Sequence, residues 1–157
     1  MSFATAVTAP RPVRLVLALT LSLAVAGPAL ASGWSEPAWG TALRRTLMDA
    51  VRPIIERNLG APVEFVVREL RVAENSGFGW LEPQRPGGRP IVFEDTPLGA
   101  GTAGQLPYDG TTVHVFWRRE NGRWLADEWS IGATDAWWTN ARACAEYRPL
   151  IHDYCGG

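Results

Sequence analysis

The chain has few of the residues from which catalytic and metal sites are built. Its 157 residues include two cysteines, two histidines and no lysine. Neither His114 nor His152 stands in an HExxH motif, and no serine after residue 31 lies in a GxSxG or SxxK motif. A histidine that binds a metal normally comes with further His, Cys or carboxylate ligands at suitable spacing. We therefore expect no bound metal, no cofactor and no serine nucleophile.

The longest apolar run is too short to cross a membrane. It covers residues 15–26, whereas a spanning helix needs about 20 apolar residues. Arg11 and Arg14 precede the run and small residues up to Ala31 follow it, which is typical of a cleavable secretory signal. We predict a Sec-type signal peptide over residues 1–31, cleaved after Ala31, and a periplasmic or secreted product. No cysteine follows the run, so no lipid anchor is expected after cleavage.

The mature chain, residues 32–157, has the length of one domain. It keeps thirteen arginines against sixteen acidic residues, and this negative balance argues against nucleic acid as a partner. Its two cysteines are Cys144 and Cys155. A spacing of eleven residues fits neither a redox CxxC motif nor a zinc knuckle, so in an oxidising compartment this pair predicts a disulfide.

Hydrophobic periodicity predicts a helix and two hairpins. Apolar residues recur at three- and four-residue spacing over residues 41–59, which indicates an amphipathic helix that Pro53 should kink or break. Residues 63–82 alternate as a first hairpin, and residues 111–132 form a second with Asn121-Gly122 at its tip. The fold class is therefore α+β: an N-terminal amphipathic helix of the mature domain on a four-stranded antiparallel sheet, with a C-terminal disulfide-closed tail.

The register of the second hairpin depends on its loop. A three-residue loop over residues 120–122, with Gly122 left-handed in a bulge, brings the apolar residues of both strands to one face. We therefore predict that loop. As a consequence, Asp127 falls on the apolar face unless a second bulge turns it outward. Between the hairpins lies a Pro/Gly-rich loop over residues 83–110, in which only residues 91–93 resemble a short strand; such loops are either functional or disordered.

Tryptophan is abundant, with eight residues, all in the mature chain. Trp80, Trp117 and Trp129 occupy positions predicted to face the core, where each buries a large area. Other tryptophans should leave indole surface exposed, which suggests contact with a partner. The predicted interaction surface consists of three of these and two arginines of the long loop: Trp124, Trp137, Trp138, Arg85 and Arg89.

Only two residues are candidates for catalysis, Asp127 and His114. An inward-facing Asp127 would be either a carboxylate with a raised pKa or the partner of an arginine. His114 stands beside Val113 and Val115 on a predicted strand. The alternative for each residue is a structural role.

Three stretches of the chain resemble, as a set, small uncharacterised exported bacterial proteins: PVEFVVRELRV, EPQRPGGRPI and FWRRENGRWLADEWSIGATDAWW. This resemblance covers about residues 41–138 and implies no known activity. The order of the predicted elements also resembles the cystatin and NTF2-like α+β folds, in which a curved sheet wraps a helix. The inhibitory glutamine-valine-glycine loop of cystatins is absent, so protease inhibition is not implied.

Two hypotheses about function result. The first is a non-enzymatic binding protein of the cell envelope, which contacts an envelope protein or a small ligand through the Pro/Gly loop and exposed aromatics. The second is a small-ligand-binding domain or carboxylate-dependent enzyme of the NTF2-like kind, acting through Asp127 and His114. An Asp127 in a ligand-sized pocket lined by Trp117 and Trp129 would favour the second.

Overall fold

The computed structural model describes residues 1, 33–101 and 108–156. Apart from Met1, the predicted signal peptide lies outside the described residues, as does the segment 102–107 of the Pro/Gly loop. Of the described helices, none is long and apolar enough to cross a membrane.

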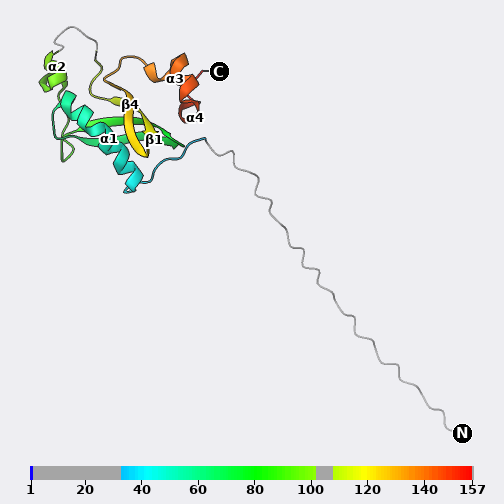
Figure 1. Ribbon diagram of the computed structural model, residues 1–157. Helices are drawn as coiled ribbons and strands as arrows, with labels where there is room; N and C mark the ends of the chain where they lie inside the picture. Colours follow the sequence, from blue (N-terminus) through cyan, green and yellow to red (C-terminus); the bar gives the residue numbers. More distant parts are fainter. Residues whose placement is uncertain (2–32, 102–107, 157) are drawn as a thin grey trace.

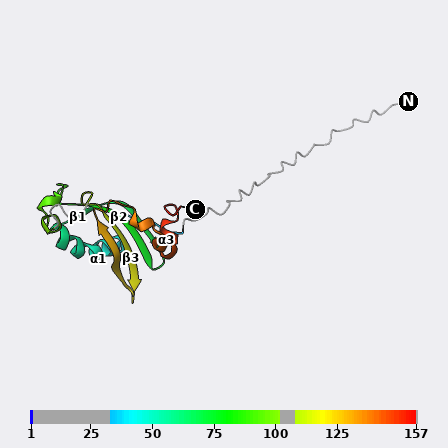
Figure 2. The same ribbon diagram turned by 90° about the horizontal axis from the view of Figure 1, so that it is seen from above.

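Four strands form one antiparallel sheet in the order β1-β2-β3-β4. They are β1 (Glu64–Ala73), β2 (Ser76–Gln84), β3 (Val113–Glu120) and β4 (Arg123–Ile131). Helix α1 (Ala42–Leu59) lies across one face, and the C-terminal segment lies against the other, so that the sheet stands between them (Figures 1 and 2). The predicted α+β class, with a helix packed on a four-stranded antiparallel sheet, is confirmed.

Helix α1 follows the periodicity of the sequence. The Thr41 hydroxyl accepts a hydrogen bond from the Arg44 amide at 3.3 Å and caps the first turn, and the chain leaves the helix at Gly60 with a φ of 80°. Of the kink or break expected at Pro53, the break does not occur, since one helix runs through this residue. Pro53 is exposed, so water can bond the carbonyl that lacks its N–H partner.

Trp117 is the centre of the core under α1. It is fully buried, and its indole lies over Gly79, where an added Cβ would stand 2.5 Å from the Trp117 Cη2 atom. The prediction of a core position is confirmed for Trp117 and wrong for Trp80 and Trp129, which are 37% and 39% exposed. Trp80 pairs with His114 on the opposite face of the sheet, and Trp129 lies on the edge strand β4, where no further strand follows.

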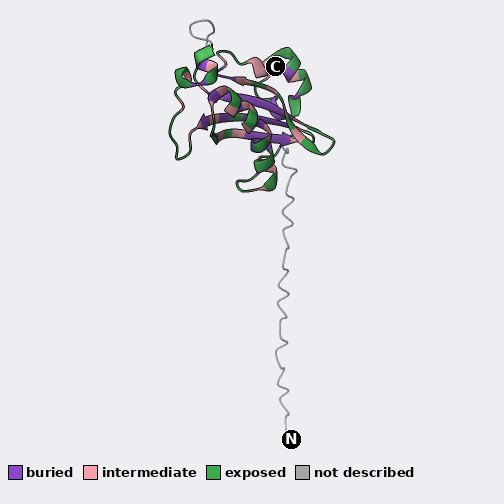
Figure 3. Cartoon of the chain, turned by 60° about the vertical axis from the view of Figure 1, so that its left-hand side comes forward, coloured by how far each residue is buried: buried purple, intermediate pink, exposed green. Residues whose placement is uncertain are grey.

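The C-terminal segment forms a third layer on the other face. It contains the 3-10 turn η2 (Trp137–Thr139) and the short helices α3 (Ala141–Glu146) and α4 (Arg148–Ile151). Tyr147 stacks on Phe116 with ring centroids 4.0 Å apart, and the Cys144–Cys155 disulfide is present as predicted. The sheet therefore has a core on each face, and its central strands β2 and β3 are mostly buried, as the purple strands of Figure 3 show.

The loop of the second hairpin differs from the prediction. Glu120 pairs with Arg123, so the loop contains two residues, Asn121 and Gly122, with φ values of 49° and 78°. Two left-handed residues match the twist of the strands, which favours this turn over the predicted three-residue loop. A bulge on β4 at Asp127 then shifts the register between Phe116 and Trp117, which returns Trp129 and Ile131, but not Leu125, to the face of Trp117.

The predicted short strand at residues 91–93 is also wrong. A 3-10 turn, η1 (Phe93–Asp95), and the short helix α2 (Pro97–Gly101) occupy this region. The Thr96 hydroxyl accepts a hydrogen bond from the Gly99 amide at 3.0 Å, so local capping favours turns here over strand pairing.

Arg71 of β1 ties the C-terminal layer to the sheet. Its guanidinium is 4% exposed and donates hydrogen bonds to the Asp153 carboxylate at 2.8 Å and to the Leu150 carbonyl at 2.7 Å, with Glu69 as a further partner. The rings of Trp34 and Tyr154 lie 4.6 and 4.9 Å from it. Burial lowers the pKa of Arg71, but the two carboxylates raise it above its ordinary value, so this cation stays charged.

Replacing Arg71 should destabilise the domain strongly. The variant Arg71→Leu leaves the carboxylates of Asp153 and Glu69 without their cation, and we expect a loss of about 3 kcal/mol in the free energy of unfolding. Urea denaturation of the oxidised protein measures this. Arg68→Leu is the matched control on the same strand, because the Arg68–Glu82 pair is exposed and should contribute much less. Equal effects of the two substitutions would contradict the role given to Arg71.

Candidate functional site

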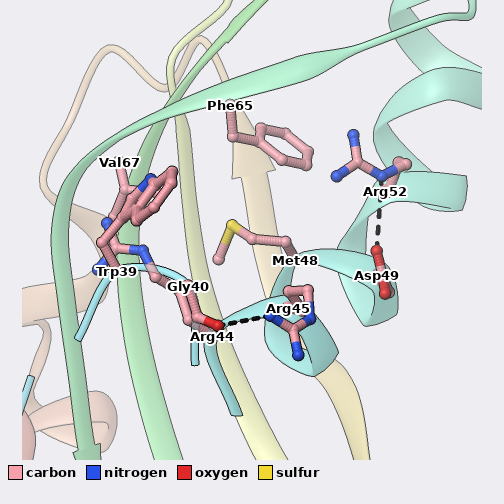
Figure 4. Close-up of a pocket in the computed structure, with 9 residues that line it drawn as sticks. All are labelled: Trp39, Gly40, Arg44, Arg45, Met48, Asp49, Arg52, Phe65 and Val67. Atoms are coloured by element: carbon pink, nitrogen blue, oxygen red, sulfur yellow. Dashed lines mark hydrogen bonds and ion pairs between the residues drawn. The ribbon is translucent and has the colours of Figure 1, made fainter. Parts of the chain in front are cut away.

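A groove lies between α1, β1 and the segment that precedes α1. It has a volume of about 680 Å³ and is open to solvent. Met48, Phe65 and Val67 provide apolar surface inside it, while Trp39 and Arg52 stand at opposite sides (Figure 4). The remaining lining residues are Gly40, Arg44, Arg45 and Asp49.

Local structure places these side chains around one space. On α1, residues four apart lie on the same side of the helix, so Arg44, Met48 and Arg52 follow one another along the groove. On β1, Phe65 and Val67 are two residues apart and share the face that packs toward α1. Gly40, with a φ of 77°, turns the chain into α1 and leaves Trp39 at the lip.

The three arginines of the groove differ in how far they are paired. Arg44 contacts Glu36 at 3.3 Å and donates to the Pro37 carbonyl at 2.9 Å. Arg52 lies 3.8 Å from Asp49, donates to the Val63 carbonyl, and stands over the Phe65 ring at 5.2 Å.

Arg45 is the least engaged of the three. It is exposed and donates to the Gly40 carbonyl, and within residues 33–101 and 108–156 it forms no ion pair with a carboxylate. Its positive charge is therefore available to a bound anion. Trp39, at the lip, is 90% exposed, so an indole face is available beside that charge.

Asp127 lies on the far side of the sheet from this groove. Its carboxylate accepts hydrogen bonds from Arg118 at 2.7 Å and from the Tyr147 hydroxyl at 2.8 Å, and Arg118 also contacts Glu146. Burial raises the pKa of Asp127, but these two hydrogen bonds lower it below its ordinary value. Of the two alternatives for Asp127, pairing with an arginine is the one observed, and the bulge carries it away from Trp117.

His114 belongs to an aromatic stack and not to a pair with Asp127. It is 5% exposed, its ring lies 3.6 Å from that of Trp138 in parallel stacking, and Trp80 flanks it at 5.1 Å. Neither ring nitrogen has a hydrogen-bond partner among the described residues. Burial lowers the pKa of His114 to about 4, so the ring is neutral at physiological pH.

The five residues predicted as an interaction surface do not lie together in the fold. Trp124 packs on the core under α1, whereas Trp137 and Trp138 are half-buried in the C-terminal layer. Arg85 donates to the carbonyls of Leu59 and Pro62 at 2.7 and 3.2 Å, which satisfies the C-terminal end of α1. Arg89 pairs through its backbone with Arg85 at an exposed turn.

Sequence reasoning therefore missed the residues of the groove. The signals were present, since Trp39 stands just before the helix and three arginines lie on its polar positions. What the sequence did not supply was which of the predicted strands lies beside these positions of the helix.

Comparison of the chain with protein-family models, with curated proteins and with solved structures finds no match in any of the three. The resemblances to exported bacterial proteins and to cystatin or NTF2-like folds therefore stay predictions. Among the described residues, no group of three or more His, Cys, Asp or Glu side chains could hold a metal ion.

The buried His114 makes stability depend on pH in a defined window. Since its pKa falls from 6.5 in the unfolded chain to about 4 in the folded one, the unfolded state binds the proton first as pH drops. The contribution of the neutral His114 to the free energy of unfolding is thus present above pH 6.5. As the pH falls toward 4, the free energy of unfolding drops by up to about 3 kcal/mol.

The variant His114→Phe keeps an aromatic ring in the stack and removes this titration. Urea denaturation of both proteins between pH 7 and pH 4 measures the difference. We expect the free energy of unfolding to fall more steeply in the parent than in the variant over that range. Parallel pH profiles would contradict a neutral, buried His114.

Proposed function

We propose that the protein is a non-enzymatic binding domain and that the groove between α1 and β1 takes an anionic ligand with an apolar part. One observation carries this proposal: three guanidinium groups and an exposed indole surround an open groove that has apolar surface inside. Its volume of about 680 Å³ falls in the range of ligand pockets.

The charge of the groove favours binding of an anion. The chain carries a net charge of −1, yet the groove holds Arg44, Arg45 and Arg52 against one acid, Asp49. This local excess of positive charge opposes the balance of the whole molecule. A guanidinium binds carboxylate, sulfonate or phosphate through two parallel hydrogen bonds, and Arg45 is the residue best placed to do so.

The inner surface supports an apolar part of the ligand. Met48 is 8% exposed, and Phe65 and Val67 are half-buried, so a ligand can displace water from their remaining surface. Trp39 can cover such a ligand from the lip, because almost all of its surface is exposed in the unbound protein.

The enzymatic alternative finds less support. Asp127 is held in ion pairs and His114 in an aromatic stack, and neither lines the groove. A general acid or base needs a position within hydrogen-bond reach of a bound substrate, which these two residues do not have in the groove. A binding role requires no such group.

Paired fluorescent probes test the groove. The anionic dye 1-anilinonaphthalene-8-sulfonate and its neutral analogue N-phenyl-1-naphthylamine share an aromatic body and differ in the sulfonate. We expect Arg45→Glu to weaken binding of the sulfonate dye by about tenfold, or about 1.4 kcal/mol, because it replaces an attractive charge with a repulsive one, and to change the neutral dye little. Trp39→Ala should weaken both dyes.

The matched control is Arg123→Glu, which makes the same change of charge at an exposed position on β4. Fluorescence titration of the folded protein at constant salt gives the dissociation constants. Binding of the sulfonate dye that responds equally to Arg45→Glu and Arg123→Glu would argue for general charge attraction and against the groove.

We further propose that this domain acts outside the cytosol, after cleavage behind Ala31. The Cys144–Cys155 disulfide supports this because such bonds persist in oxidising compartments. Expression of the full chain in a Gram-negative host should yield periplasmic or secreted protein whose first residue, by N-terminal sequencing, is Ser32. Leu19→Arg, which interrupts the apolar run, should leave uncleaved protein in the cytosol; an uncleaved chain in the parent as well would contradict export.

A further inference from the structure

Strand β1 is an edge of the sheet, and only one end of it is paired on the outer side. Ser35 exchanges two hydrogen bonds of 2.9 Å with Val72, and within the described residues this is the one bridge that β1 makes away from β2. The N–H and C=O groups on the outer side of an edge strand are a template for another strand.

The groove lies where that edge is open. Ser35 is bridged near the C-terminal end of β1. From there the chain continues to Trp39 and Gly40 and then enters α1. The register of β1 shifts between Val67 and Glu69, which separates the bridged end from the stretch Glu64–Val67. Phe65 and Val67 of that stretch line the groove, and no residue of β2, β3 or β4 does.

An added strand would use both faces of this edge. Alternate side chains of a strand beside Glu64–Val67 would enter the groove, where Met48 and Phe65 offer apolar contact and Arg45 offers a charge. The intervening side chains would lie on the opposite face, where Val66 is 37% exposed. Charge complementarity selects the occupant, because guanidinium groups favour acidic side chains.

We propose that the ligand of the groove is a short acidic peptide segment that adds to β1 as a fifth, outer strand. The open stretch is four residues long, so a segment of about four to six residues fills it. Backbone hydrogen bonds to Glu64–Val67 supply affinity, and side chains in the groove supply specificity. This inference rests on the proposed function and names the ligand class of the same groove.

A library of random octapeptides, displayed and selected against the folded oxidised protein, tests the inference. Counter-selection against Arg45→Glu removes peptides that do not use the groove. We expect acidic and apolar residues to alternate along the enriched peptides. In amide hydrogen exchange followed by NMR, they should slow exchange along Glu64–Val67 at least tenfold while leaving β4 unchanged.

Backbone N-methylation of an enriched peptide gives a second readout that a side-chain contact would not produce. Methylation at alternate positions should weaken binding by about tenfold, because those N–H groups bond β1, and methylation at the positions between should change it little. Uniform tolerance of methylation, or binding without slower exchange in β1, would overturn the inference.

The remaining outcomes are also decisive. Selection that yields no peptide above the Arg45→Glu background would overturn the inference. If binding of the sulfonate dye still depends on Arg45 in that case, the proposed binding function stands without the peptide ligand. Concentration-dependent dimerisation of the parent protein that slows the same β1 amides would overturn it in favour of a second copy of this chain as occupant. Loss of the Arg45 effect on the dye would overturn the proposed function itself.

Discussion

The Arg71 guanidinium is the contact on which the arrangement of the layers depends. It stands on β1 with its partner Glu69, and its other partners belong to the segment before α1 and to the last residues of the chain. A buried cation is costly unless its hydrogen bonds are made, and here Asp153, Glu69 and the Leu150 carbonyl make them. The C-terminal layer therefore cannot leave the sheet without exposing a charge whose partners it carries. The disulfide limits how far that segment can unfold, whereas Arg71, together with the stacking of Tyr147 on Phe116, holds it against the sheet.

Much of the fold was predictable because its signals are local. The helix over residues 42–59 shows a 3.6-residue period, and an Asn-Gly pair predicts a hairpin wherever two alternating runs flank it. The errors arose where distant parts decide. Trp80 has the alternation of a core residue, but it lies on the face opposite α1, and the C-terminal layer on that face, whose docking no local pattern encodes, leaves it 37% exposed. The bulge at Asp127 is of the same kind, since it depends on the Arg118 and Tyr147 groups that the carboxylate meets.

The candidate site was less predictable than the fold. The groove takes its residues from three segments, and Trp39 and Phe65 become neighbours only when β1 lies beside α1. Arg85 shows the reverse case. In the sequence it is a charged residue of a Pro/Gly-rich loop and suggests a surface contact, but in the fold its guanidinium satisfies the last carbonyls of α1. Arginine number and position alone do not distinguish a cap from a ligand-binding group; the carbonyls within reach do.

Covering both faces of a small sheet restricts where the molecule can meet a ligand. With α1 on one face and the C-terminal layer on the other, the exposed parts of the sheet lie mainly on its two outer strands, β1 and β4. The edge at β4 presents exposed apolar groups, Leu125 and Trp129, and its Glu128 is already paired with Arg142. The edge at β1 combines apolar surface with an arginine, Arg45, that no carboxylate of the described residues engages. A selective contact needs both an attractive charge and a surface from which water can be displaced, and at the β1 edge one groove brings the two together.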